Sequence, residues 1–367
     1  MKIARTAAAV ASALLTIVAL AGCTNAVSPG HAPSVDPKVA KIGLLLPDSV
    51  TARYENADKP FFAAELKRLC AECELLYANA DGDASKQQQQ QAESMVAQGV
   101  SVLVLDPFDS EAAASIAADA HAKGIPVISY DRLVDSKYLD YYISFDNEKV
   151  GRLQAQALVE RLKAQGTGRG DHGILMLNGS PTDNNAILFK KGAHSVIDKS
   201  GYRVLAEYDT PGWDPAKAQD WVTGQLTQFG GRIDGIYAAN DVLAGAAIAS
   251  LKAADVSPLR PVIGQDAELA AVQRILAGDQ YMTVYKAVEP EAQKAAQLAV
   301  ALTRSQHPAA QSTVRIAGTN VPSFLLSVTP VRADNVEVTV VKDKFYGPTT
   351  VAKICTDYKS ACAEHGI

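Results

Sequence analysis

Residues 101–131, SVLVLDPFDSEAAASIAADAHAKGIPVISYD, decide the fold. A short run of branched apolar residues is followed by an alanine-rich segment of helical length and then by a second apolar run. We expect a buried strand, a helix over residues 110–123 and a second buried strand that lies parallel to the first. The second strand ends at once on Asp131 and Arg132. This acid and base either close a turn as a solvated ion pair or face a polar ligand.

The same alternation extends in both directions from this unit. Upstream, strand-like KIGLLLP (41–47) and ELLYANA (74–80) alternate with helices expected over residues 59–69 and 84–98. Downstream of YYISFDN (141–147), a second series has strand-like segments at 173–179, 202–209, 233–241, 260–267 and 282–286, and expected helices at 148–163, 185–199, 215–229, 243–253, 268–277 and 291–304. The pattern predicts an α/β protein with two doubly wound parallel-sheet lobes.

The tail continues past the second series with strand-like FLLSVTPV (324–331) and VEVTVV (336–341). A chain that continues in this way is expected to cross back between the lobes. We therefore assign residues 41–145 with 286–322 to an N-terminal lobe, and residues 146–285 with 323–367 to a C-terminal lobe.

The N-terminus is typical of an export signal. Lys2 and Arg5 precede an apolar run at 7–21, and LAGC (20–23) resembles a bacterial lipobox. We expect a lipoprotein signal peptide over 1–22, lipid on Cys23 and a flexible tether over 23–40, which is rich in Ser, Pro, Ala and Gly. The protein would then be anchored at the outer face of the cytoplasmic membrane. An ordinary secretory signal with an incidental cysteine is the alternative.

Charge and motifs exclude several classes of ligand. Loss of Lys2 and Arg5 changes the formal net charge from −5 to −7, and no basic patch suggests nucleic acid. GTGRG (166–170) precedes a strand instead of following one, and NADGDAS (79–85) has no glycine at the position that a calcium loop requires. We expect no cofactor and no metal.

Four cysteines follow Cys23, and their even number in an exported chain suggests disulfides. We favour the local pairs Cys70–Cys73 and Cys355–Cys362. CAEC (70–73) could instead be a redox motif or half of a zinc site. It ends an expected helix rather than beginning one, and no second CxxC or His lies near it in sequence, so a structural disulfide is preferred.

Polar and aromatic residues gather where the expected strands end, which is where parallel α/β sheets bind ligands. They are Arg53, Tyr54, Asp131, Arg132, Asp183, Asn184, Asn185, Trp213, Asn240, Asp241, Gln265, Asp266 and Lys286. Asp183 and Asp241 are interpreted as helix caps. Arg, Lys and Trp do not cap helices, and together with the carboxylates and amides they suit a polyol. A phosphate would need a glycine-rich loop, and the first loop has no glycine.

Seven blocks in order resemble the periplasmic sugar-binding proteins of ABC importers, of the ribose, galactose and xylose type. They are YDR (130–132), YISFDNEKVG (142–151), SPTDNNA (180–186), AAND (238–241), GQDAE (264–268), MTVYK (282–286) and VPSFLL (321–326). The resemblance covers residues 41 to about 341. It implies a type I periplasmic binding protein, whose two lobes are joined by three crossover strands and close over sugar. We place the crossings near residues 143–147, 284–286 and 322–325.

The resemblance also implies roles for single residues. The candidates for binding sugar hydroxyls are Arg53, Asp131, Arg132, Asn184 or Asn185, Asn240, Asp266 and Lys286, and the ring-stacking pair is Tyr54 and Trp213. Tyr54 stands where xylose-type members carry a Trp. The paired cysteines and the C-terminal extension lie outside the family pattern.

These observations predict a monomeric, non-enzymatic receptor. It would capture a monosaccharide, D-xylose or a related aldopyranose, and deliver it to an ABC permease. A sugar receptor for chemotaxis or kinase sensing is an alternative. A glycosidase with Asp131 and Asp266 as its acid pair is disfavoured, because basic neighbours would keep both ionised. A transcription regulator would carry a DNA-binding helix pair where this chain has its export signal.

Overall fold

The structure is a computed structural model that describes residues 39–49, 51–80, 84–168 and 170–367. The expected signal peptide, Cys23 and almost all of the expected tether lie outside these residues. No helix in the described part of the chain is long and apolar enough to cross a membrane.

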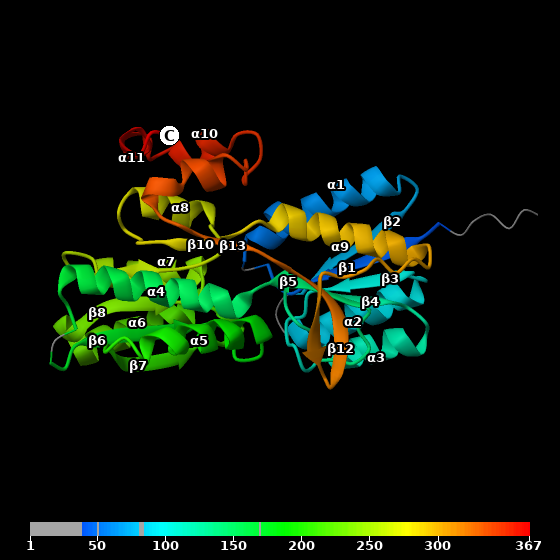
Figure 1. The fold of residues 1–367 in the computed structure, drawn as a ribbon, viewed down its shortest axis with the longest axis horizontal. Helices are drawn as coiled ribbons and strands as arrows, with labels where there is room; N and C mark the ends of the chain where they lie inside the picture. The colour runs from blue at the N-terminus through cyan, green and yellow to red at the C-terminus, as the bar shows by residue number, and fades with distance from the viewer. Residues whose placement is uncertain (1–38, 50, 81–83, 169) are drawn as a thin grey trace, which may run out of the picture. The chain divides into compact units, whose positions relative to one another are not determined.

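A seven-stranded sheet forms the N-terminal lobe, in the order β11-β12-β5-β4-β3-β1-β2 (Figure 1). Its strands are β1 (Lys41–Leu46), β2 (Glu74–Asn79), β3 (Val102–Leu105), β4 (Val127–Tyr130), β5 (Tyr141–Phe145), β11 (Ser312–Ile316) and β12 (Thr319–Leu326). All neighbouring pairs are parallel except β11 and β12, which are antiparallel. The strands that the opening stretch predicted, β3 and β4, are wholly buried, as expected of a sheet covered on both faces.

Helices cover both faces of this sheet. One face packs against α1 (Lys59–Leu69) and α9 (Val288–Thr303), and the other against α2 (Ala84–Ala97) and α3 (Ala114–Ala122). The helix α1 ends at Leu69, and a disulfide between Cys70 and Cys73 closes the turn that leads to β2. Thus CAEC does follow a helix, and its two cysteines pair with each other.

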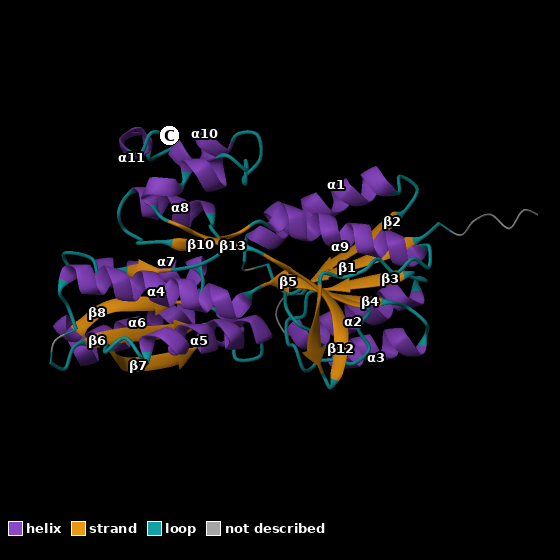
Figure 2. Cartoon of the chain, viewed as in Figure 1, coloured by secondary structure: helices purple, strands orange, loops and turns teal. Residues whose placement is uncertain are grey.

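The C-terminal lobe is built on a four-stranded parallel sheet in the order β7-β6-β8-β9 (Figure 2). The strands are β6 (Gly173–Asn178), β7 (Arg203–Asp209), β8 (Ile233–Ala238) and β9 (Val262–Ile263). The helices are α4 (Asn147–Gln165), α5 (Asn184–Ile197), α6 (Pro215–Phe229), α7 (Asp241–Ala253) and α8 (Leu269–Leu276). Packing of α4 on α5 and of α6 on α7 encloses one hydrophobic core.

The chain passes between the lobes three times. It crosses after β5 into α4, after β10 (Thr283–Lys286) into α9, and after β12 into β13 (Val328–Val331), which pairs antiparallel with β10. The first two crossings lie where the resemblance places them. The third lies later, because β12 stays paired with β5 through Leu326. The expected lobe boundary after residue 322 therefore falls inside a strand of the N-terminal lobe.

Residues 333–367 form a helical segment that we call the C-terminal cap. It comprises the short helical turns Ala333–Asn335 and Glu337–Val341, the helix α10 (Thr350–Cys355) and the helix α11 (Lys359–Glu364). A disulfide joins Cys355 to Cys362. The strand expected over residues 336–341 is wrong: Val336 and Val340 are buried whereas Val338 is exposed, a spacing that suits a helix.

Candidate functional site

A pocket of about 300 Å³ lies between the lobes, at the carboxyl ends of strands from both. Thirteen residues line it: Thr51, Arg53, Tyr54, Asp131, Arg132, Asp183, Asn185, Phe189, Trp213, Asn240, Gln265, Asp266 and Lys286. Three of them, Asp131, Trp213 and Asp266, have a positive φ although they are not glycine. Strained backbone of this kind concentrates at binding sites, where it aims side chains that regular structure would direct elsewhere.

Asp131 directly follows β4, and its backbone is in the left-handed region with a φ of 51°. Its carbonyl accepts hydrogen bonds from Ser144 Oγ (2.6 Å) and Asn185 Nδ2 (3.2 Å), which hold the turn. The carboxylate then enters the pocket. One oxygen lies 3.2 Å from Arg53 Nη1, and the other lies 3.2 Å from Asn185 Nδ2 and 3.8 Å from Lys286 Nζ.

The surroundings of Asp131 keep its carboxyl group ionised. Burial alone would raise its pKa, but the charges of Arg53, Lys286 and Arg132 outweigh burial and lower the pKa below its ordinary value. Asp131 is therefore a permanent hydrogen-bond acceptor, not a proton donor, across the physiological range.

Arg132 turns away from its neighbour. Its Nη2 lies 3.1 Å from Asp48 Oδ2 and its Nε 3.0 Å from Asp183 Oδ2, with Asp106 3.9 Å away. Among the described residues, no ion pair joins Asp131 to Arg132. The interpretation as a solvated ion pair is wrong, because both side chains are buried and bind other partners.

Arg53 is the hub of a buried ionic cluster. It donates two hydrogen bonds to Asp58, from Nε at 3.0 Å and from Nη2 at 2.8 Å, and a third to Glu291 Oε2 at 3.2 Å. Its Nη1 faces Asp131 and lies 3.8 Å from Asp266 Oδ1. All of these groups are less than a tenth exposed, so the planar guanidinium fixes carboxylates from both lobes at once.

Lys286 and Asp266 form the part of the pocket contributed by β10 and the loop after β9. Lys286 Nζ lies 3.1 Å from Asp266 Oδ1. Burial alone would lower the pKa of Lys286, but Asp131 and Asp266 outweigh burial and raise the pKa. Asp266 has a φ of 101°, and its backbone N–H donates a hydrogen bond to the carbonyl of Val284 in β10 at 2.9 Å.

The pocket carries no surplus of positive charge. In the described part of the chain, three buried cations, Arg53, Arg132 and Lys286, contact seven carboxyl groups. Burial raises the pKa values of Asp106, Asp183 and Glu291. Carboxyl groups thus outnumber cations, a balance that suits a neutral ligand rather than an anion.

Three aromatic rings complete the lining. Tyr54 comes from the N-terminal lobe, and Trp213 and Phe189 come from the C-terminal lobe. The ring centroids of Trp213 and Phe189 lie 6.5 Å apart in an edge-on arrangement. Trp213 Nε1 donates to Asp183 at 3.0 Å. The ring lies over Gly179, where a Cβ would come within 2.1 Å of it, so only glycine leaves room for this indole.

The two lobes are held closed by direct polar contacts. Beside the pocket, Ser110 N–H donates to the Thr182 carbonyl at 2.9 Å, and Ser110 Oγ accepts from Asn184 N–H at 3.1 Å. Inside it, the Arg132–Asp183 ion pair and the Asn185–Asp131 hydrogen bond also cross the cleft. Pocket groups of one lobe thus serve as partners for those of the other.

The structure brings together nine of the ten residues that the resemblance selects. The exception is Asn184, which begins α5 and lines a separate hollow near Ser110. Asp183 caps α5 as expected but also lines the pocket, and Asn240, not Asp241, caps α7.

Four lining residues were not selected: Thr51, Asp183, Phe189 and Gln265. Gln265 stands at a strand end that the sequence analysis did identify, beside Asp266. Phe189 follows Asn185 by four residues in α5, so helical periodicity could have placed it on the same face. Thr51 lies in the loop after β1 and has no comparable signal in the sequence.

Glu268, in the same loop as Asp266, makes stability depend on pH. Burial, with the nearby charges of Asp241 and Asp266, raises its pKa to about 8 from an ordinary 4.5. Between these values the folded chain binds a proton that the unfolded chain does not, so the free energy of unfolding falls as pH rises. We expect Glu268→Gln to make this fall shallower and to be more stable than wild type near pH 9.

Urea denaturation at pH 5, 7 and 9 measures this effect. The matched control is Glu337→Gln, because Glu337 is exposed on the C-terminal cap. Parallel pH profiles for wild type and Glu268→Gln would contradict the assignment.

Comparison with known proteins identifies the family. A periplasmic binding protein domain model matches residues 42–307. The D-xylose-binding periplasmic protein of Escherichia coli is 37% identical over 313 residues, which span 84% of this chain and 92% of that protein. The multiple sugar-binding periplasmic receptor ChvE of Rhizobium radiobacter is 32% identical, over 90% of this chain and 97% of that one. A carbohydrate transporter solute-binding protein from Chloroflexus aurantiacus, solved with D-glucose, superposes with a TM-score of 0.76 at 30% identity, covering 85% of this chain and 98% of that one. The chain therefore belongs to the periplasmic binding protein domain family and has its type I fold.

Proposed function

We propose that this protein captures a single neutral monosaccharide between its lobes and delivers it to the permease of an ABC importer. The observation that carries the proposal is the Asp131 carboxylate, which is buried, ionised and in contact with Arg53, Lys286 and Asn185. A carboxylate set among donors in this way can accept from sugar hydroxyls while the neighbouring cations donate to hydroxyl and ring oxygens.

The chemistry of the lining supports a polyol. The lining contains both donors and acceptors, and the rings of Trp213 and Phe189 offer apolar surface for the C–H face of a sugar. The excess of carboxyl groups over cations disfavours a phosphorylated sugar or a sugar acid.

Within this class we propose D-xylose or a related aldopyranose. The relatives support this range, since one is named for D-xylose, one for multiple sugars, and one was solved with D-glucose. Tyr54 is the position at which we expect selectivity to differ from xylose-type relatives, because its ring is smaller than indole and carries a hydroxyl group.

Capture would work by lobe closure. Arg53 and Asp131 come from one lobe, and Asn185, Trp213 and Asp266 from the other. A sugar that bonds to both sets is bound more tightly by the closed form, and therefore shifts the population towards it. The permease would then recognise the closed form.

We further propose that the mature protein is a monomer held at the outer face of the cytoplasmic membrane by lipid on Cys23. Fractionation with mass spectrometry tests the anchor: wild type should sediment with membranes and carry a lipid mass on Cys23, whereas Cys23→Ser should lack that mass and keep residues 1–22. Recovery of wild type in the soluble fraction would refute lipidation.

A glycosidase is disfavoured by the state of Asp131. An acid that protonates a leaving group needs a raised pKa, whereas the cations around Asp131 lower its pKa. Release of nitrophenol from aryl glycosides by the purified protein would reverse this conclusion.

The experiment that tests the proposed function is isothermal calorimetry of residues 24–367 with a panel of D-xylose, D-glucose, D-galactose, D-ribose and L-arabinose. We expect saturable 1:1 binding of at least one aldopyranose and no binding of xylose 5-phosphate. The absence of heat and of a melting shift with every sugar would refute the proposal.

Trp213→Ala should weaken sugar binding about 10- to 100-fold, because it removes both the stacking surface and the hydrogen bond to Asp183. Trp221→Ala is a matched control, since Trp221 is the second Trp of the chain and stacks on Tyr208 outside the pocket. The same variant leaves Trp213 as the sole indole, so its emission should change when sugar is added. Equal affinity in both variants would contradict a stacking role.

A further inference from the structure

The C-terminal cap contacts the backbone that presents Asp266 to the pocket. Tyr346, which is partly buried, donates a hydrogen bond from its hydroxyl group to the carbonyl of Ala267. Ala267 directly follows Asp266 in the loop between β9 and α8. The cap thus lies against the outer side of the loop whose inner side lines the pocket.

This loop needs external support. Asp266 and Ala267 are consecutive non-glycine residues with φ of 101° and 51°, a conformation that is unfavourable in an isolated chain. On the inner side, Ala267 N–H donates to Thr283 Oγ1 of β10 at 3.1 Å. On the outer side, Tyr346 binds the carbonyl of the same residue. The peptide groups on either side of Ala267 are therefore fixed from opposite directions.

The cap also holds β10, which carries Lys286. Tyr285 donates from its hydroxyl group to Asp343 Oδ2 at 3.1 Å, and its ring meets Phe345 edge-on with centroids 4.9 Å apart. Lys286 is the next residue in the strand, and its Nζ lies 3.1 Å from Asp266 Oδ1. Both members of this pocket ion pair are thus adjacent to residues that the cap binds.

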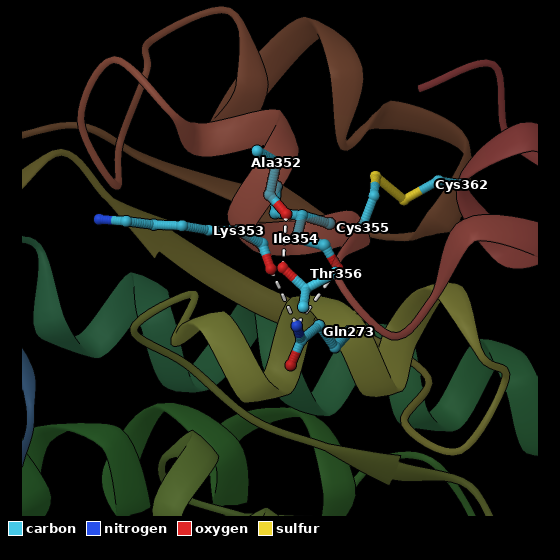
Figure 3. Close-up of a disulfide and its surroundings, with 7 residues drawn as sticks. All are labelled: Gln273, Ala352, Lys353, Ile354, Cys355, Thr356 and Cys362. Atoms are coloured by element: carbon cyan, nitrogen blue, oxygen red, sulfur yellow. Dashed lines mark hydrogen bonds between the residues drawn. A yellow bond between two sulfur atoms is a disulfide. The ribbon is translucent and has the colours of Figure 1, made fainter.

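The cap is itself fixed in place. Gln273 of α8 donates from Nε2 to the carbonyls of Lys353 and Ile354, at 3.1 and 3.2 Å (Figure 3). The Cys355–Cys362 disulfide ties α10 to α11, and Ile354 and Cys362 are buried in one cluster with residues of α8 and β10. A covalently closed segment is a firmer support than a free C-terminal tail.

We propose that the disulfide-closed C-terminal cap is a positioning element for the ligand pocket, and that Tyr346 is the positioning residue that holds Asp266 opposite Lys286 and Arg53. The inference rests on the proposed sugar-binding function, because it concerns the affinity of that pocket. Tyr346 does not line the pocket and would act only through the loop.

Tyr346→Phe tests the proposal, with D-xylose and D-glucose as probes in calorimetry and melting. We expect the Kd to rise about tenfold with little change in melting temperature without sugar, because the ring keeps its contact with Phe345 and only the hydroxyl group is lost. The matched control is Tyr358→Phe, which removes a hydroxyl group within the same cap at a residue with no side-chain hydrogen bond in the described structure, and should leave the Kd unchanged.

A double-mutant cycle with Asp266→Asn separates positioning from general destabilisation. If Tyr346 acts through Asp266, Tyr346→Phe should weaken binding in the wild-type background and add almost nothing in the Asp266→Asn background. Equal factors in both backgrounds, or an unchanged Kd for Tyr346→Phe, would overturn the proposal. Failure of wild type to bind either probe would instead refute the pocket assignment on which the proposal rests.

Tyr285→Phe provides a second variant should Tyr346→Phe fail to fold. It removes the cap's hydrogen bond to β10 and keeps the ring contact with Phe345. We expect a weaker, several-fold rise in Kd that also disappears in the Asp266→Asn background. An additive effect would again overturn the positioning role.

Discussion

Asp131→Asn should raise the Kd for the bound sugar at least about 100-fold, which corresponds to about 2.7 kcal/mol. The carboxylate offers two acceptor oxygens among Arg53, Lys286 and Asn185. An amide of the same shape loses one acceptor and adds a donor that faces these donors. Charge-assisted hydrogen bonds contribute about 1.5–3 kcal/mol each, so the loss of one, together with the new donor facing other donors, accounts for the expected effect.

Calorimetry with the tightest sugar of the panel measures this loss. Asp135→Asn is the matched control, because Asp135 is exposed in the same loop and does not line the pocket. Circular dichroism should show that both variants fold. An Asp131→Asn variant with wild-type affinity would remove Asp131 from the site and with it the main support for the proposed function.

Arg53→Met should have the largest effect on stability, a loss of about 3–5 kcal/mol in the free energy of unfolding. Arg53 is 7% exposed and pairs with Asp58, Asp131 and Glu291. Methionine fills similar space but leaves Asp58 and Glu291 without a cation and Asp131 with Lys286 alone, and breaking a buried ionic cluster in this way costs that amount.

The deficit of Arg53→Met should shrink as pH falls. Without Arg53 the pKa values of its partner carboxyl groups rise, so the folded variant takes up protons at a pH where the unfolded chain is still ionised. Urea denaturation at pH 5 and pH 8 measures the difference. Arg315→Met is the control, because Arg315 is exposed on β11 and forms no ion pair in the described part of the chain, so its replacement should change the free energy of unfolding little. A deficit that is equal at both pH values would contradict the electrostatic explanation.

Much of the site could be predicted because its signals are local. The short apolar runs and the helix-length segment between them predicted β3 and β4, and a parallel sheet brings the residues after each strand to one edge. Asp131, Trp213, Asp266 and Lys286 therefore came together in the structure as the sequence analysis expected. Their residue types excluded simple helix capping.

The partners of those residues could not be predicted, because partner choice is set by packing between distant segments. Arg53 pairs with Glu291, which lies 238 positions along the chain on an apolar face of α9. Nothing in the local pattern distinguishes that buried acid from an exposed one. The choice of Asp48 and Asp183 as partners of Arg132, in place of adjacent Asp131, has the same origin.

The error at residues 336–341 arose from composition. VEVTVV alternates in the way a strand does and is rich in β-branched residues. In the structure Val336 and Val340 both pack into the core formed with α8 and β10. This tertiary packing outweighs the local preference for a strand.

The crossings between the lobes also set an order of assembly. The strands and helices of the C-terminal lobe's four-stranded sheet are contiguous, from α4 to α8, whereas the N-terminal lobe needs α9, β11 and β12 in addition to its first five strands. During synthesis the N-terminal lobe emerges first, and the edge of β5 therefore stays unpaired until β12 has been synthesised through Leu326. The half that emerges second has all four strands of its parallel sheet by Ile263, and only its β10–β13 pair is completed later. Until then the apolar edge of β5 is unpaired, and it is the part of the nascent chain at which a chaperone would most reduce aggregation.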